Sequence, residues 1–108
     1  EIKTEFKPEG KFSFSKEKEK ALYFITEEAL NNILKHARAK AVVIKLFRRD
    51  GQVNLDIMDD GKCFDPQQSE TGGRGLRNMR ERASQIGAQF SITSEPGKGT
   101  RISLSFPE

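Results

Sequence analysis

Residues 16–37, KEKEKALYFITEEALNNILKHA, decide the fold because the hydrophobic period of the chain changes in this stretch. Apolar residues recur here at steps of three and four, which predicts a helix with one buried face. The residues of that face are Leu22, Ile25, Ala29, Ile33 and Ala37, with Phe24, Leu30 and Leu34 beside them. Ser15 is a suitable N-cap, and acidic residues follow it in the first turn. We therefore predict a helix from about Lys16 to His36 or Ala37.

The segments that follow alternate between apolar and polar residues and so predict strands. Residues 42–47 and 53–58 flank Asp50-Gly51, a dipeptide that favours a tight hairpin turn. Residues 90–106 predict a second hairpin around the turn Glu95-Pro96-Gly97-Lys98-Gly99. Between the hairpins, an apolar face predicts another helix that ends at Gly87, formed by Leu76, Met79, Ala83 and Ile86.

The two ends of this pattern complete the predicted domain. Residues 1–14 predict two short strand-like pieces around the turn Pro8-Glu9-Gly10. The polar segment from Asp60 to Gly75 is long for a loop in so small a domain, which indicates a functional element. The order of elements predicts an α/β (α+β) two-layer sandwich, with a mostly antiparallel mixed sheet and helices on one face.

Composition bounds the classes of protein to which the chain can belong. The 108 residues suit a single domain, residues 1–108, and the absence of an initial Met suggests a piece of a longer protein. Apolar runs are too short for a transmembrane helix or a signal peptide. One Cys and one His exclude an internal disulfide and a structural zinc site of Cys and His ligands. A net charge of +3 with interleaved signs does not by itself indicate nucleic-acid binding.

Three polar residues share one stripe of the predicted long helix. Glu28, Asn32 and Lys35 stand at i, i+4 and i+7, so a carboxylate, an amide and an ammonium group line up beside the apolar face. One interpretation is an ordinary solvated face. The other is a chemical site, in which the carboxylate activates a nucleophile, the amide oxygen binds Mg²⁺ and the ammonium group contacts phosphate.

Asp59 continues the core-facing parity of the strand that carries Val53, Leu55 and Ile57. Its carboxylate should therefore emerge on the core side at the end of the strand, with Asp60 pointing the other way. Burial there requires hydrogen-bond donors. The exocyclic amino group of a purine would serve, and so would the backbone amides of a turn at Gly61.

Glycines suggest phosphate binding but match neither common nucleotide motif. Gly72-Gly73-Arg74-Gly75 immediately precede the predicted second helix, where backbone amides are suited to bind phosphate. Gly97-Lys98-Gly99-Thr100 lacks the upstream glycine of a Walker P-loop. A dinucleotide fingerprint that starts at Gly73 has Asn78 where its third glycine belongs.

Four segments in order resemble the N, G1, G2 and G3 boxes of the GHKL (Bergerat-fold) ATPase superfamily. They are Glu28-Ala29-Leu30-Asn31-Asn32-Ile33-Leu34-Lys35-His36-Ala37, Asp59-Asp60-Gly61-Lys62-Cys63-Phe64-Asp65, Gly73-Arg74-Gly75-Leu76-Arg77-Asn78-Met79-Arg80-Glu81-Arg82 and Gly97-Lys98-Gly99-Thr100. The first and third are similar to the catalytic domain of bacterial two-component sensor histidine kinases, in the group that signals to response regulators with helix-turn-helix output domains.

The resemblance implies a role for each matching residue. Glu28 would orient or activate the attacking group, Asn32 would bind Mg²⁺, and Lys35 and His36 would contact ATP. Asp59 would accept from the adenine amino group, with Gly61 and Thr100 lining the base pocket and Thr100 acting through a water. Residues 63–73 would form the ATP lid, and Gly73, Gly75 and Leu76 would contact the nucleotide, the two glycines as hinge and phosphate cradle. Cys63 departs from the family pattern, which has glycine there, and implies a lid of different local shape.

The resemblance also implies a partner, because the histidine that accepts phosphate in this family lies on a separate dimerisation domain. His36 falls in the nucleotide-facing stretch and is not that acceptor. We therefore expect a cytoplasmic domain that donates the γ-phosphate of Mg·ATP to a histidine on the dimerisation domain, with the response regulator as an indirect partner. In a membrane-anchored sensor it would be part of the cytoplasmic portion. Nucleic-acid binding and direct membrane insertion are not expected.

Two alternative functions are a serine protein kinase of the anti-sigma-factor type and a non-catalytic binding module. The run Met79-Arg80-Glu81-Arg82 and the short lid disfavour the first. Asp59 with the ordered glycine boxes disfavours the second.

Overall fold

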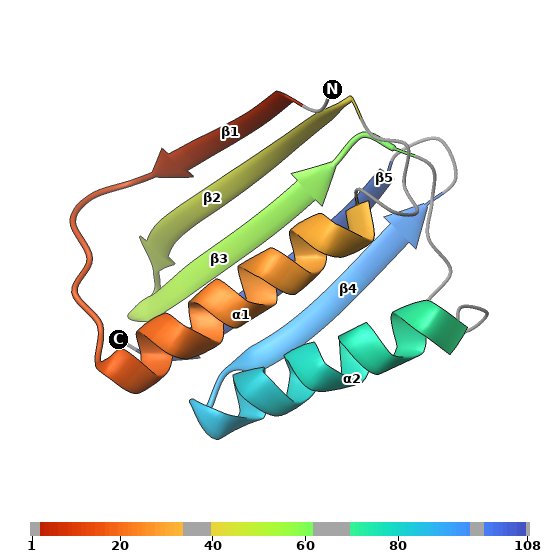
Figure 1. Ribbon diagram of the computed structural model, residues 1–108. Coiled ribbons are helices and arrows are strands. Elements are labelled where there is room, and N and C mark those ends of the chain that lie inside the picture. The colour runs from red at the N-terminus through yellow and green to blue at the C-terminus, as the bar shows by residue number, and fades with distance from the viewer. Residues whose placement is uncertain (1–2, 34–39, 62–69, 96–98, 108) are drawn as a thin grey trace.

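A computed structural model of the chain describes residues 3–33, 40–61, 70–95 and 99–107. In these ranges it has two layers, a five-stranded sheet and two helices that both cover the same face of it (Figure 1). The strand order is β1-β2-β3-β5-β4, with β1 parallel to β2 and the other neighbours antiparallel. The predicted two-layer sandwich, with a mostly antiparallel mixed sheet, is confirmed.

Helix α1, Lys16–Asn32, begins where the sequence predicts. The Lys18 amide donates to the Ser15 side chain at 3.3 Å, which satisfies one of the free amides at the helix start. Ala21, Ile25 and Ala29 follow at steps of four and are buried against the sheet. The predicted part of the helix beyond Ile33, which contains Lys35 and His36, lies outside the described residues.

The central strands form the predicted hairpins. Strands β2, Ala41–Arg49, and β3, Gln52–Asp59, join at Asp50 and Gly51, whose φ angles of 54° and 76° are those of a tight hairpin turn. Strands β4, Gln89–Glu95, and β5, Gly99–Pro107, form the second hairpin. Side chains of β3 and β5 that face the helices fill the core, which contains Leu55, Ile57, Ile102 and Leu104.

The N-terminal segment contains one strand and not the two pieces predicted. Strand β1, Lys3–Pro8, pairs with β2, but Phe12 and Phe14 lie in irregular chain. Their rings stack with centroids 5.7 Å apart, and Phe14 packs edge-on against Phe106 of β5. The two rings therefore pack on the end of the core, in the segment that leads into α1. Their separation by two residues in the sequence does not reflect strand pairing.

Helix α2, Glu70–Gln85, begins at Glu70 and not at about Leu76, which is a correction to the predicted boundary. Glycine lowers helix stability by about 1 kcal/mol relative to alanine but has no steric conflict with helical dihedral angles, so the glycines at 72, 73 and 75 enter the helix. The predicted end is confirmed. Gly87 has φ 68°, the Ala88 amide donates to Ala83 and the Gly87 amide to Ser84, which is a Schellman cap.

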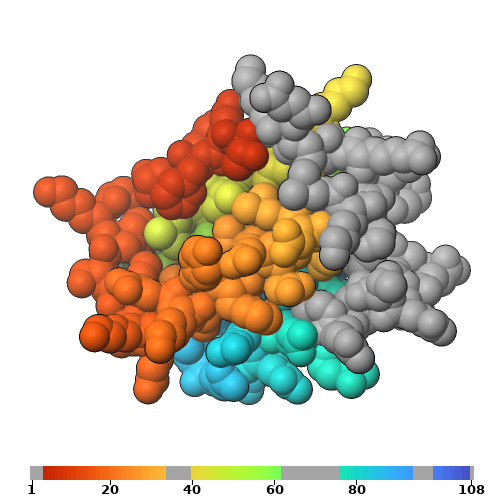
Figure 2. All heavy atoms as spheres, in the orientation of Figure 1, coloured from red at the N-terminus to blue at the C-terminus, as the bar shows by residue number. Residues whose placement is uncertain are grey.

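Four ends of helices and strands lie together at one end of the sheet. The C-terminal end of α1, the N-terminal end of α2, the end of β3 and the start of β5 all lie there (Figure 1). Figure 2 shows α1 over the middle of this face with α2 beside it and β1 at the opposite edge. In the described part of the chain, no helix combines the length and the apolar character that crossing a membrane requires.

Candidate functional site

Asp59 is the last residue of β3, and its carboxylate is buried on the helix-covered side as its parity predicts. Only 6% of the residue is exposed. Its Oδ1 accepts from the Gly61 amide at 2.8 Å, so the turn predicted as one alternative is present. Its Oδ2 is buried and has no hydrogen-bond partner among the described residues. A buried acceptor without a donor costs about 1–3 kcal/mol, so Oδ2 is open to a donor from a ligand.

Strand β5 begins beside this carboxylate. Thr100 is paired with Asp59 across the ladder and is itself buried, with 8% exposed. Gly99 precedes it with φ 84°, and a Cβ on Gly99 would overlap the carbonyl oxygen of Asp59 and come within 2.9 Å of its carbonyl carbon. Asp59, Gly61 and Thr100 thus lie together. Gly99, whose role the sequence left open, is what lets the two strands approach.

Glu28 and Asn32 lie in the last turns of α1, one helical turn apart on the same stripe. Both are half-buried, beside the core-facing residues Ala29 and Ile33. The end of α1 that carries them is the end that lies near the end of β3 (Figure 1). The Asn32 amide offers a neutral hard oxygen, which is a donor that Mg²⁺ accepts. No group of three or more His, Cys, Asp and Glu side chains suited to a metal occurs in the described ranges.

The remaining predicted site residues fall into two groups. Lys35, His36, Cys63 and most of the predicted lid, residues 63–73, lie outside the described residues. The backbone of Gly73 and Gly75 belongs to the first two turns of α2. Because the helix begins at Glu70, the Gly73 amide is among the first four that a helix leaves free for an anion, whereas the Gly75 amide lies beyond them. Leu76 is buried in the core, so its side chain serves packing, and nucleotide contact through its backbone stays a prediction.

Asp60 has a role that the sequence did not indicate. Its Oδ1 accepts from the amides of Lys40 and Ala41 at 2.9 and 3.0 Å, and its own amide donates to the Ala41 carbonyl. These bonds fasten the end of β3 to the start of β2. The bonds from the Ala41 and Lys40 amides also lower the pKa of Asp60, whereas burial raises the pKa of Asp59 against the opposing effects of the Gly61 and Thr100 amides. An exposed Asp beside a strand end is a common turn residue, so sequence alone did not distinguish this one.

The raised pKa of Asp59 predicts that the ligand-free domain is less stable when this group is ionised. Below the unfolded pKa of 3.8 the carboxyl group is protonated in both states, and the free energy of unfolding has its full value. As the pH rises through the higher folded pKa, the free energy of unfolding falls. The variant Asp59→Asn should therefore be at least as stable as the wild type at pH 7 and should lack this component of the pH dependence. Urea unfolding of both proteins at pH 4 to 8 measures this. A large loss of stability in the variant at pH 7 would contradict it.

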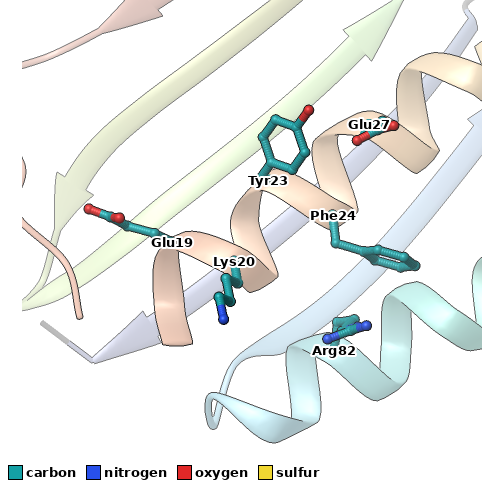
Figure 3. A pocket seen from close by; sticks show the side chains of 6 residues that line it. All are labelled: Glu19, Lys20, Tyr23, Phe24, Glu27 and Arg82. Carbon is teal, nitrogen blue, oxygen red and sulfur yellow. The ribbon is translucent and has the colours of Figure 1, made fainter. Parts of the chain in front are cut away.

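A hollow lies between the helices and shares no residue with the predicted site. It has a volume of about 540 Å³ and is lined from α1 by Glu19, Lys20, Tyr23, Phe24 and Glu27, and from α2 by Arg82. Phe24 and Arg82 point toward each other from the two helices, whereas Tyr23 points away from α2 (Figure 3). The Arg82 guanidinium lies 4.7 Å from the centre of the Phe24 ring, a cation–π contact that joins α1 to α2.

Residues 17–108 match the family model described as histidine kinase-, DNA gyrase B- and HSP90-like ATPase. The sensor protein VraS of Staphylococcus aureus strain COL is 43% identical over 96 residues, which is 89% of this chain and 28% of VraS. VraS of Staphylococcus saprophyticus is 44% identical over the same share of each chain. This chain therefore spans less than a third of the length of the curated relatives that it matches.

Solved structures share the fold at lower sequence identity. The histidine kinase domain of the blue-light activated kinase from Erythrobacter litoralis EL346 superposes with a TM-score of 0.80 at 22% identity, over 98% of this chain and 51% of that one. Full-length ShkA in complex with AMPPNP gives 0.81 at 20% identity, over 98% and 25%. The predicted resemblance to sensor-kinase catalytic domains is confirmed, and the chain belongs to the family of histidine kinase-, DNA gyrase B- and HSP90-like ATPases.

Proposed function

We propose that this domain binds Mg·ATP and donates its γ-phosphate to a histidine on a separate dimerisation domain. The observation that carries the proposal is the buried Oδ2 of Asp59, which lacks a donor among the described residues and lies where α1, α2, β3 and β5 converge. In a chain of this ATPase family, the adenine amino group is a donor of the right kind for that oxygen.

Asp59 and its neighbours would hold the base. Oδ1 is already occupied by the Gly61 amide, which fixes the carboxylate and leaves Oδ2 to accept from the amino group. Thr100, adjacent across the ladder, would reach the base through a water. Because the carboxylate is preorganised and desolvated before the ligand arrives, little free energy is spent on reorienting it.

Residues at the end of α1 and the start of α2 would handle the phosphates. Asn32 would bind the metal ion, and Glu28, one turn earlier, would orient the attacking group. Mg²⁺, when bound, would neutralise charge on the phosphate oxygens. Lys35, His36, Gly73, Gly75 and Leu76 remain proposed nucleotide contacts. Positioning and charge stabilisation carry most of the catalysis in phosphoryl transfer, so the role of the chain is to hold ATP in one orientation.

The proposed partners follow from the relatives. VraS is a sensor protein, and this chain matches 28% of it. The dimerisation and phosphoacceptor domain of the same kinase is therefore the proposed direct partner, with a response regulator of the helix-turn-helix output group as the indirect one. A cytoplasmic location is part of the same proposal.

Loss of the Asn32 amide should weaken the metal-dependent part of ATP binding. We expect Asn32→Ala to reduce the gain in ATP affinity that Mg²⁺ provides by about tenfold, or about 1.4 kcal/mol, while binding without Mg²⁺ changes little. Calorimetric titration with ATP, with and without Mg²⁺, measures both quantities. The matched control is Asn31→Ala, because Asn31 is the neighbouring amide but is exposed. Equal effects of the two variants would remove Asn32 from the metal site.

A further inference from the structure

An ion pair on the open face of the sheet joins the two strands that carry Asp59 and Thr100. Arg101 Nη2 of β5 donates to Asp56 Oδ2 of β3 at 2.6 Å. Only 7% of the Asp56 side chain is exposed, although no described helix covers this face, whereas the Arg101 side chain is 55% exposed. A nearly buried carboxylate on an open face is unusual, and nothing in the proposed chemistry uses it.

The strand register places this pair on the reverse side of the proposed base site. Asp56 is opposite Ser103, Met58 is opposite Arg101, and Asp59 is opposite Thr100. The bond between Asp56 and Arg101 is therefore a diagonal across the ladder. Side chains alternate between faces, so Asp56 and Arg101 lie on the open face while Asp59 and Thr100 lie on the helix side. Arg101 directly follows Thr100 in β5, and Asp56 precedes Asp59 by three residues in β3.

The Asp56–Arg101 ion pair lies near the end of the β3–β5 ladder, where it can affect the proposed site. Asp59 and Thr100 are the last pair of the β3–β5 ladder, and β5 begins at Gly99, which has φ 84°. Pairs at the end of a ladder open more readily than central ones. A short charge-assisted hydrogen bond just inside the last pair resists that opening. Removing Arg101 also leaves the nearly buried Asp56 carboxylate without its paired cation, which loosens the strands further.

We propose that the Asp56–Arg101 ion pair positions Asp59 and Thr100 for nucleotide binding, an inference that rests on the proposed function. Asp56 and Arg101 are positioning residues that do not touch the nucleotide. They hold the two strands at the separation at which Oδ2 of Asp59 meets the base and the Thr100 side chain reaches it through a water. Their loss should therefore weaken discrimination by Asp59 as well as overall affinity.

The test compares ATP with inosine triphosphate, which has a carbonyl in place of the adenine amino group. We expect Asp56→Asn and Arg101→Gln each to raise the Kd for ATP by about fivefold, or about 1 kcal/mol, and to lower the preference for ATP over inosine triphosphate. The double variant should be no worse than the more impaired single variant, because both remove one interaction. Measurements are made in conditions where urea unfolding shows every variant folded.

The matched control is Glu5→Gln, which removes the ion pair between Glu5 and Lys7 on the same face but on the edge strand β1. It should leave both nucleotide affinities unchanged. A variant Asp56→Asn that unfolds at lower urea but keeps the wild-type preference for ATP would overturn the proposal, since a purely structural role predicts that result. Should Arg101→Gln not fold, Asp56→Asn, of nearly equal volume, decides alone. Failure of the proposed function is distinguishable, because Asp59→Asn would then bind ATP like the wild type.

Discussion

Replacing Asp59 by Asn is expected to raise the Kd for ATP by about 100-fold or more, or about 2.7 kcal/mol. Asp59 has two oxygens with different tasks, because Oδ1 accepts from the Gly61 amide and Oδ2 is left for a ligand. Asn has only one oxygen. If that oxygen keeps the bond to Gly61, the amide group of Asn faces the adenine amino group, and two donors oppose each other. Calorimetric titration with ATP in the presence of Mg²⁺ measures the loss.

The neighbouring carboxylate provides a matched control. Asp60→Asn removes a charge one residue away, but both of its amide donors bond to the same oxygen, which Asn retains. We expect the affinity of Asp60→Asn for ATP to stay within about threefold of wild type, or about 0.7 kcal/mol. Wild-type ATP affinity in Asp59→Asn would remove Asp59 from the base site, and an equal loss in both variants would show that charge near the strand end matters more than the placement of Oδ2.

Replacing Gly99 by Ala is expected to have the largest effect on stability. Two penalties add at this position. The φ of 84° is unfavourable for any residue with a Cβ, and that Cβ would overlap the Asp59 carbonyl. We expect a loss of about 3 kcal/mol in the free energy of unfolding, since overpacking contributes about 1–3 kcal/mol and a left-handed backbone about 1–2 kcal/mol. Urea unfolding measures it, and ATP binding should fall as well because β5 must move away from Asp59.

Gly51→Ala is the matched control for the backbone penalty alone. Gly51 has a similar φ of 76° in the β2–β3 turn, but an added Cβ there would meet nothing within 4 Å. We expect this variant to lose about 1 kcal/mol. The difference between the two variants then measures the close approach of β5 to β3. Similar losses at both positions would mean that Gly99 is required only for its dihedral angle.

Local patterns were sufficient for the parts of the fold that local forces determine. The N-cap at Ser15, the turn at Asp50-Gly51 and the helix end at Gly87 are each formed by residues close in sequence, and the structure has all three. Strand parity likewise placed Asp59 on the core side, because alternation is a geometric property of any strand. The same alternation put Asp56 on the open face and suggested nothing about its burial.

The features that sequence did not predict depend on contacts between distant residues. Asp56 is buried and is bonded to Arg101, 45 positions away, a pairing that no local pattern specifies. The sequence shows a glycine at position 99 but not the reason for it. A side chain there would overlap the backbone of Asp59 on another strand. The start of α2 at Glu70 went against local propensity, since three glycines in its first turns disfavour a helix. The alternation of Phe12 and Phe14 with polar residues is typical of a strand, but it results from the packing of both rings at the end of the core.

Phosphate transfer to a partner domain tests the central claim most directly. The domain is incubated with γ-labelled ATP, Mg²⁺ and the separately expressed dimerisation domain of the same kinase, with Asp59→Asn as the inactive control. The account predicts label on the dimerisation domain that is lost in acid and stable in alkali, as phosphohistidine is, and no label with the variant. Acid-stable label, as expected of phosphoserine, or no transfer from a domain that binds ATP, would contradict it.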